Sequence, residues 1–224
     1  MAKNSQSVIL VTGATGNVGR QVVSQLLDTG SRVRALTRDP DSATLPDGVD
    51  VARGDLSVPD SLEPCLDGVE SVFLVWPGVT TEVEPATLTM LAKHASRIAS
   101  CVAARALIHE RDIAAVAARA LTGDGHTGAK YVLTGPATMT QIEQVHTIGE
   151  AIGRPLRFEE ISAEAARQQM LTEGWPTALA DGVVNLLARL ITEAALVTST
   201  VEEVTGTPAR TFRQWAVDHA EDFR

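Results

Sequence analysis

The sequence predicts an α/β fold, a doubly wound parallel sheet followed by a small, mostly helical C-terminal region. Two observations predict it. Short continuous apolar runs alternate with segments whose apolar residues recur at helical spacing, which is the rhythm of βαβ units joined by right-handed crossovers. A glycine-rich turn also separates the first apolar run from the first amphipathic segment.

Composition limits the class of protein. With 224 residues, 44% of them hydrophobic and 21% charged, the chain is long enough for one compact domain or one domain with a small appendage. The formal net charge of −9 and the lack of any Lys/Arg run argue against nucleic acid or an anionic membrane as a partner. No apolar stretch approaches the roughly 18 residues of a membrane span. Cys65 and Cys101 have neither metal-like nor disulfide-like spacing, so we expect reduced thiols, no metal site and a cytoplasmic protein.

The first half of the chain contains the clearest elements. Residues 7–12 (SVILVT) form an apolar run typical of a parallel strand buried on both faces. The helix that follows has its apolar side chains on one face, and Gly30 should end it. Further strands are predicted over 32–37, 49–53 and 71–75, with a short, Pro64-containing helix at 60–66 between the last two.

The second half predicts mostly helices. A helix is expected over 83–96, and another from Asp112 as N-cap to Gly123. Residues 130–134 and 157–161 are predicted strands. Thr140 and Glu143 form a capping box that starts a helix through residue 151. Later helices are predicted over 163–172, 177–193 and 208–221, the last capped by Thr207 with Pro208 as its first residue.

The turn VTGATGNVGR carries the clearest functional signal. Gly13, Gly16 and Gly19 follow a buried strand and open a helix, where a tight turn must let the backbone approach a pyrophosphate. Amide groups at the helix N-terminus then face the phosphates. This context favours a dinucleotide-binding, Rossmann-like domain over a glycine turn without a ligand. No Gly-Lys-Ser/Thr follows, so the turn is not a Walker loop.

The residues after the second strand bear on the choice of cofactor. Arg38 could grip a 2′-phosphate with two hydrogen bonds, which favours NADP. A solvated arginine, or one stacked on adenine, is the alternative. Asp39 leaves NAD open, because an acidic residue there could hold the ribose hydroxyls.

Two further segments lie where other parts of the cofactor would sit. Asp55 follows the third strand and could accept a hydrogen bond from the adenine amino group, although an Asx turn within the loop explains it equally well. Val75, Trp76 and Pro77 leave the fourth strand at its carboxyl end, where ligands of open α/β sheets bind. Trp76 could flank the cofactor or an aromatic substrate, or simply pack in the core.

These residues, taken together, resemble the NmrA-like branch of the atypical short-chain dehydrogenases/reductases. The resemblance rests on TGATGNVGR, RALTRDP, GDLSVPDSL and FLVWPG, and later on HERDIAAVA, YVLTGP, EAIGRP and TPARTFRQWA. It implies an NAD(P)-binding domain with a C-terminal region over the substrate cleft. Family members include quinone reductases, tailoring enzymes for aromatic polyketides and redox-sensing regulators. The cofactor-binding residues carried over from the resemblance are Gly13, Thr15, Gly16, Asn17, Val18, Arg38, Asp55, Leu56, Val75, Trp76 and Pro77.

The chain departs from this family in its middle. Between Ser96 and His109 the family has a fifth strand, a further helix and more, whereas this chain has room for about one strand. The Tyr-x-x-x-Lys dyad of typical reductases is absent, because the only tyrosine is Tyr131 and position 135 is glycine. Hydride transfer to an electron-poor ring needs little acid catalysis, so redox chemistry remains open. His94, His109 and His126 are weak candidates for an acid, and no catalytic residue is assigned.

The sequence therefore supports two hypotheses. The first is an NAD(P)H-dependent oxidoreductase that acts on a quinone or polycyclic aromatic, with aromatic polyketide tailoring as one setting. The second is a non-catalytic NAD(P)-binding redox sensor. In either case residues 1–112 would form the dinucleotide-binding core, and residues 113–224 would complete the sheet and cover the cleft. The expected partner is a small aromatic or quinone substrate, and a homodimer is left open.

Overall fold

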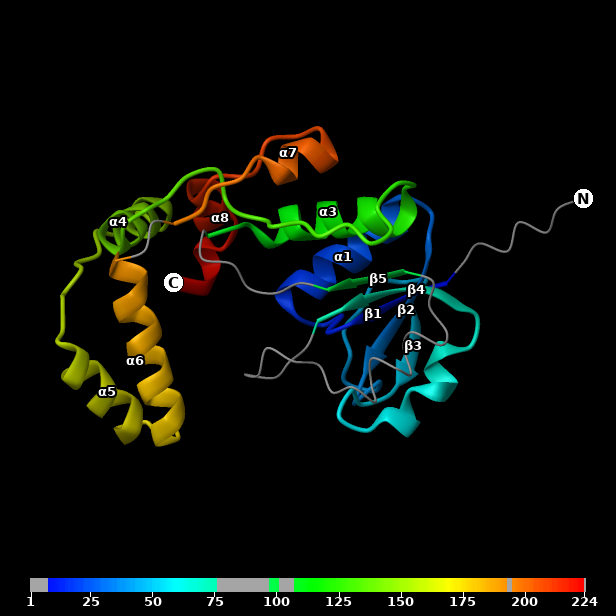
Figure 1. Cartoon of the computed structure of the whole chain (residues 1–224), viewed down its shortest axis with the longest axis horizontal. Coiled ribbons are helices and arrows are strands. Elements are labelled where there is room, and N and C mark those ends of the chain that lie inside the picture. The colour runs from blue at the N-terminus through cyan, green and yellow to red at the C-terminus, as the bar shows by residue number, and fades with distance from the viewer. Residues whose placement is uncertain (1–7, 76–96, 101–106, 193–194, 224) are drawn as a thin grey trace, which may run out of the picture.

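The computed structural model describes residues 8–75, 97–100, 107–192 and 195–223 (Figure 1). Five strands form one parallel sheet in the order β3-β2-β1-β4-β5. Their bounds are β1 Val8–Thr12, β2 Arg32–Thr37, β3 Asp50–Arg53, β4 Val69–Leu74 and β5 Arg97–Ser100. The predicted parallel α/β architecture is confirmed, with β1 buried along its whole length as its apolar run indicated.

Both faces of the sheet are covered, which explains the continuous apolar strands. Ile9 and Val11 of β1 point to the face covered by α1 (Asn17–Asp28) and α3 (Glu110–Thr122). These two helices lie side by side over the sheet in Figure 1. Val8 and Leu10 point to the opposite face, where the short 3₁₀ turns η1 (Pro59–Ser61) and η2 (Glu63–Leu66) lie. The expected helix over 60–66 is therefore two 3₁₀ turns, and Pro64 stands in the first turn of η2.

The second 3₁₀ turn also buries a thiol. Cys65 is 2% exposed, and its Sγ–H donates to the carbonyl of Arg53 at 3.1 Å. Burial raises the pKa of the Cys65 thiol. A buried, hydrogen-bonded thiol of this kind is a structural group.

The C-terminal region is mostly helical, as predicted. It contains α4 (Gln141–Ala151), α5 (Ala163–Thr172), α6 (Thr177–Thr192), α7 (Thr200–Thr205), α8 (Phe212–Asp218) and η3 (Ala220–Phe223). The capping box of Thr140 and Glu143 is confirmed at the start of α4. In Figure 1, α5 and α6 form a hairpin to one side of the sheet. No helix in the described ranges is both long and apolar enough to cross a bilayer.

Two predicted strands were wrong. Residues 130–134 and 157–161 are not strands, because no described strand lies beside them to form a ladder. The first segment instead meets residue 198: Thr198 donates its amide to Thr134 Oγ1 at 2.9 Å and its hydroxyl to the Val132 carbonyl at 2.8 Å. The C-terminal part therefore adds no strand to the sheet within the described residues.

Two helix starts were also wrong. Helix α3 begins three residues earlier than expected from Asp112, with His109 at the N-cap, because Asp112 uses its carboxylate on Arg210 instead. The last helix begins at Phe212, since Thr211 forms a capping box with Gln214.

The middle of the chain remains short in three dimensions. Strand β5 ends at residue 100, and α3 begins at residue 110 and packs on α1. The helix predicted over 83–96 lies outside the described residues. The proposed boundary at residue 112 stays a prediction, although α3 contributes Ala114, Ala117 and Leu121 to the same core as α1.

Candidate functional site

The glycine turn between β1 and α1 is tightly folded. Gly13 has φ +61°, a value that favours glycine, and its carbonyl accepts the Gly16 amide at 2.9 Å. A Cβ on Gly19 would lie 2.1 Å from the Gly13 carbonyl oxygen, so only glycine lets the helix approach the turn this closely. The spacing of the glycines therefore has the structural basis that a dinucleotide turn requires.

The first turn of α1 presents its backbone to the outside. Gly16 is the N-cap and provides no side-chain hydrogen bond to the helix amides. Gly13, Thr15, Gly16 and Asn17 are exposed, while Val18 packs partly against the core. The amide groups and the positive end of the helix dipole thus form a suitable surface for an anion.

The side chain of Thr12 links the carboxyl ends of the neighbouring strands β1 and β4 by hydrogen bonds. Thr12 is fully buried; its hydroxyl donates to the Val75 carbonyl at 3.1 Å and accepts the Val75 amide at 2.7 Å. In the order β3-β2-β1-β4-β5, the chain reverses its direction of strand addition between β1 and β4. Open α/β sheets bind ligands at this reversal. Thr12 therefore fixes Val75 beside the glycine turn, a role that the sequence analysis missed.

Arg38 and Asp39 lie at the carboxyl end of β2. Both are exposed. The Asp39 amide donates to Thr37 Oγ1 at 3.2 Å, which shapes the turn after the strand. The Arg38 side chain has no hydrogen-bond partner in the described part of the chain, so its guanidinium is available to a ligand there.

Asp55 forms the Asx turn that was one of its two interpretations. Its Oδ1 accepts the Ser57 amide at 2.9 Å and the Ser57 hydroxyl at 2.7 Å. These two hydrogen bonds, with a smaller contribution from the Arg38 charge, hold the pKa of the Asp55 carboxyl below its usual value. Because both bonds use Oδ1, the turn leaves Oδ2 for another donor. The sequence analysis did not anticipate Ser57, although Asx turns commonly bond two residues onward.

The remaining predicted site residues divide into two groups. Leu56 is buried in the core beside Leu62, so only its backbone can face a ligand. Val75 is partly buried at the end of β4, whereas Trp76 and Pro77 lie outside the described residues. The described part thus brings the glycine turn and Val75 together. The positive charge of Arg38 helps to lower the pKa of the Asp55 carboxyl.

Two of the three histidines considered as acids, His109 and His126, are hydrogen-bonded to neighbouring side chains. His109 is 1% exposed, with Nε2 3.3 Å from Asp218 Oδ2 and Nδ1 accepting the Arg111 amide at 3.3 Å. His126 Nδ1 lies 2.6 Å from the hydroxyl of Tyr131. His94 lies outside the described residues. The only tyrosine is therefore bonded to a histidine of the loop after α3.

Comparison with known proteins tests the resemblance. A model of the NmrA-like family matches residues 5–102. A (4-alkanoyl-5-oxo-2,5-dihydrofuran-3-yl)methyl phosphate reductase from Streptomyces griseus is 34% identical, in an alignment that covers 96% of this chain and 99% of the relative. The chain belongs to the NmrA-like family. An NAD(P)H azoreductase from Xenophilus azovorans is 30% identical, in an alignment that covers 96% of this chain and 99% of the relative. The names of these relatives agree with the predicted class of NAD(P)-dependent oxidoreductase.

The alignments also bear on the short middle. They span 281 and 283 positions, more than the 224 residues of this NmrA-like chain. The relatives therefore contain residues within the aligned region that this chain lacks; that these fall between Ser96 and His109 stays a prediction.

Solved structures of similar fold include NADP(H)- and NADPH-dependent enzymes. The triphenylmethane reductase of Citrobacter sp., in complex with NADP(H), has a TM-score of 0.77 at 19% identity, covering 95% of this chain and 99% of that one. An NADPH-dependent quinone oxidoreductase from Escherichia coli has a TM-score of 0.71 at 21% identity, covering 96% and 100%. At these identities the likeness establishes the shared fold.

Proposed function

We propose that this NmrA-like protein is an NADPH-dependent reductase that delivers hydride to an electron-poor conjugated ring. The observation that carries the proposal is the turn at Gly13–Gly19, which leaves the first amides of α1 uncapped and exposed next to the carboxyl end of β1. A pyrophosphate fits such a turn, because the backbone can approach it without a Cβ in the way.

The residues around the turn fit the other parts of the cofactor. Arg38 would hold the 2′-phosphate of NADP, and Asp55 Oδ2 could accept from the adenine amino group. Thr12 keeps Val75 fixed beside the turn, and the residues after Val75 would flank the nicotinamide. When bound, the nicotinamide supplies the hydride, while the chain supplies orientation and excludes water.

The choice of substrate follows from the sequence, which lacks the Tyr-x-x-x-Lys dyad, and from the described part of the chain, where the candidate acids His109 and His126 are bonded to other side chains. Quinones and polycyclic aromatics accept hydride into a delocalised ring, so the new charge spreads without a positioned acid. The names of the two relatives point the same way, since an azo group and a furanone double bond beside a carbonyl are also electron-poor. Aromatic polyketide intermediates are one natural source of such rings.

A direct experiment measures cofactor oxidation. The protein would be mixed with NADPH or NADH and a panel of one quinone, one azo dye, one polycyclic quinone and one unsaturated lactone, and absorbance at the nicotinamide band would be followed. We expect NADPH consumption with at least one acceptor. Arg38→Gln should raise the KM for NADPH by about tenfold and leave that for NADH unchanged, because one phosphate contact is lost.

Arg157→Gln is the matched control, since Arg157 is exposed and far along the chain in the C-terminal region. It should behave like the parent protein. Tighter binding of NADH than of NADPH would overturn the assignment of Arg38, and no consumption with any acceptor would overturn the reductase.

A second function, a non-catalytic redox sensor, is favoured by one observation. Only nine residues join β5 to α3, and the relatives contain residues that this chain lacks. If those residues wall the substrate cleft in the relatives, the cofactor site could persist without turnover. Submicromolar NADPH affinity together with no oxidation above background would select the sensor.

A further inference from the structure

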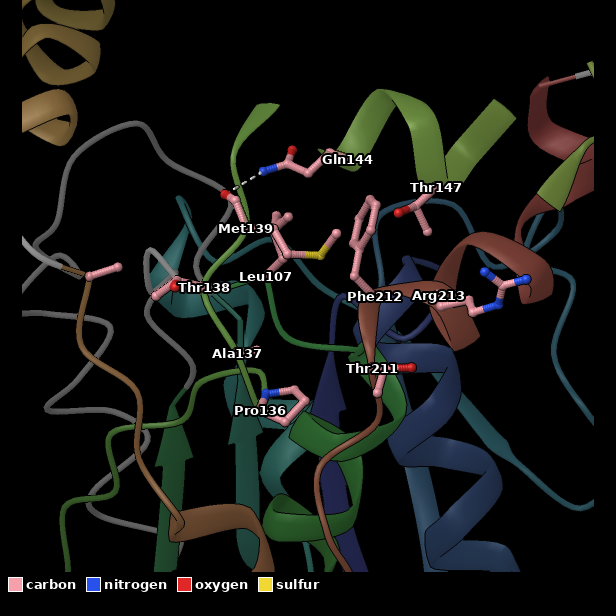
Figure 2. A pocket seen from close by; sticks show the side chains of 11 residues that line it. Leu107, Pro136, Ala137, Thr138, Met139, Gln144, Thr147, Thr211, Phe212 and Arg213 are labelled. Atoms are coloured by element: carbon pink, nitrogen blue, oxygen red, sulfur yellow. Dashed lines mark hydrogen bonds between the residues drawn. The ribbon is translucent and has the colours of Figure 1, made fainter. Parts of the chain in front are cut away.

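The exposed arginines of the chain differ in whether an acidic side chain pairs with them, and Arg213 belongs to the paired kind. It lies at the edge of a cavity of about 190 Å³ in the C-terminal region, whose wall includes Leu107, Met139 and Phe212. Figure 2 shows the Arg213 side chain pointing away from this cavity. Its Nη1 pairs with Glu150 Oε2 at 2.5 Å, so Arg213 has its counter-ion within the chain.

Arg20, next to the glycine turn, is the contrasting case. Its side chain is exposed, and Nη2 donates to the Thr15 carbonyl at 3.2 Å. In the described part of the chain, no acidic side chain lies within ion-pair distance of Arg20, and Nε and Nη1 have no partner. Because Thr15 belongs to the glycine turn, the bond to its carbonyl holds an uncompensated positive charge beside that turn.

The position of Arg20 on α1 is electrostatically unfavourable without a ligand. Arg20 is the fourth residue of α1, and its amide donates to the Gly16 carbonyl at 3.0 Å. The first turn of α1 contains no acidic residue. The N-terminal end of a helix carries partial positive charge, so a cation close to it is repelled. An anion bound at this end would be attracted by both the helix and the guanidinium.

We propose that Arg20 is a further cofactor-binding residue, whose guanidinium pairs with the pyrophosphate of the dinucleotide while Nη2 holds the Thr15 carbonyl. The inference rests on the proposed function, because it assigns a new residue to the same site. The pyrophosphate is common to NADPH and NADH, whereas the 2′-phosphate assigned to Arg38 occurs in NADPH alone. The two arginines should therefore differ in the cofactors that they affect.

Calorimetric titration with NADPH and with NADH tests this difference. Arg20→Gln should weaken the binding of both cofactors by about fivefold, because a charge-assisted hydrogen bond to a phosphate is lost. Arg20→Lys keeps the charge without the planar fork, so its affinities should lie between those of the parent protein and Arg20→Gln. Arg213→Gln is the matched control: it removes an exposed arginine that already has a counter-ion, and it should bind both cofactors like the parent protein.

Thermal unfolding separates cofactor binding from a purely structural role of Arg20. Without cofactor, Arg20→Gln should have the Tm of the parent protein or a slightly higher one, because it removes a cation from the positive end of α1. At a fixed concentration of NADPH, the ligand-induced rise in Tm should be smaller in Arg20→Gln, since weaker binding stabilises the folded state less. A role limited to the Thr15 bond would instead lower the Tm without cofactor.

The failure of this inference is distinguishable from the failure of the proposed function. If the parent protein binds neither NADPH nor NADH, the proposed function is wrong. If the parent protein binds them and Arg20→Gln binds both equally well, only the assignment of Arg20 is wrong. If Arg20→Gln weakens NADPH alone, Arg20 contacts the 2′-phosphate, and its assignment to the pyrophosphate is wrong. A lowered Tm without cofactor, together with unchanged affinities, would also overturn the inference.

Discussion

At the residue scale, Gly19 is the position with the least freedom. An added Cβ would overlap the Gly13 carbonyl oxygen at 2.1 Å, and the backbone cannot swing away as a flexible side chain could. We predict that Gly19→Ala lowers the free energy of unfolding by about 2 kcal/mol and weakens NADPH binding at least about tenfold. Urea unfolding and calorimetric titration measure the two effects.

Gly182 provides the matched control. It lies in α6, and a Cβ there would meet nothing within 4 Å. Gly182→Ala should stabilise the protein by about 0.5–1 kcal/mol through helix propensity and leave NADPH binding unchanged. If both variants lost the same free energy of unfolding, the close approach of Gly19 to the Gly13 carbonyl would not be a special constraint.

Asp55 offers a second prediction at this scale. The Ser57 amide and hydroxyl hold the pKa of the Asp55 carboxyl below its usual value. A lowered folded-state pKa contributes stability that is present above the unfolded value and is lost as pH falls through the folded value. Ser57→Ala removes the hydroxyl bond and should raise the pKa of Asp55 toward its ordinary range, as measured by carboxyl NMR titration. Arg38→Gln should raise it less, and a larger effect of Arg38 would contradict this order of causes.

At the element scale, the sequence was informative where periodicity and burial agree. The first strand, its helix and β2 were predicted closely because both sheet faces are covered and the apolar pattern is unbroken. The misplaced strands at 130–134 and 157–161 have apolar residues, yet Val132 and Ile161 are each 52% exposed. A pattern of apolar residues indicates a need for burial, but it does not supply a neighbouring strand. The start of α3 was missed because Asp112 bonds to a residue 98 positions away.

That long-range contact gives a prediction for the packing of α3. The Asp112 carboxylate is 2% exposed, accepts the Arg210 amide at 2.6 Å and pairs with the Arg210 guanidinium. Asp112→Ala leaves a partly buried cation and an unpaired amide, so it should cost about 2–3 kcal/mol of unfolding free energy. Glu150→Gln breaks a solvent-exposed ion pair instead and should cost less than about 1 kcal/mol. Chemical denaturation of both variants makes the comparison, and similar costs would contradict it.

At the scale of the whole molecule, stability should be unevenly distributed. No residue of α5 is buried, and Arg167 links α5 to α6 through Asp181 at 2.6 Å, whereas β1 is buried throughout. We predict that α5 amides exchange with solvent at least about a hundredfold faster than β1 amides, because local opening there exposes little apolar surface. Hydrogen exchange with peptide-level resolution measures this, and uniform protection would contradict it.

At this scale the candidate site also shows that sequence patterns reveal contiguous segments but not contacts between distant residues. The strand, turn and helix around Gly13 are contiguous, so sequence alone located the phosphate turn. Thr12 and Val75 are 63 positions apart, and no local pattern signals their two hydrogen bonds. The cavity beside Phe212 joins residues from 107 to 213, which come together only through the packing of α4 and α8. Such sites require tertiary structure.

The buried thiol of Cys65 can report how often the packing of η2 against the sheet opens. Alkylation requires a thiolate that the reagent can reach. In the native state the raised pKa of the Cys65 thiol disfavours the thiolate, and burial keeps the reagent away. In a Cys101→Ser variant, the rate at which iodoacetamide labels Cys65 would therefore measure how often η2 separates from the sheet. A ligand that binds at the glycine turn should slow the alkylation of Cys65, whereas a ligand bound only to the C-terminal helices should leave the alkylation rate unaltered.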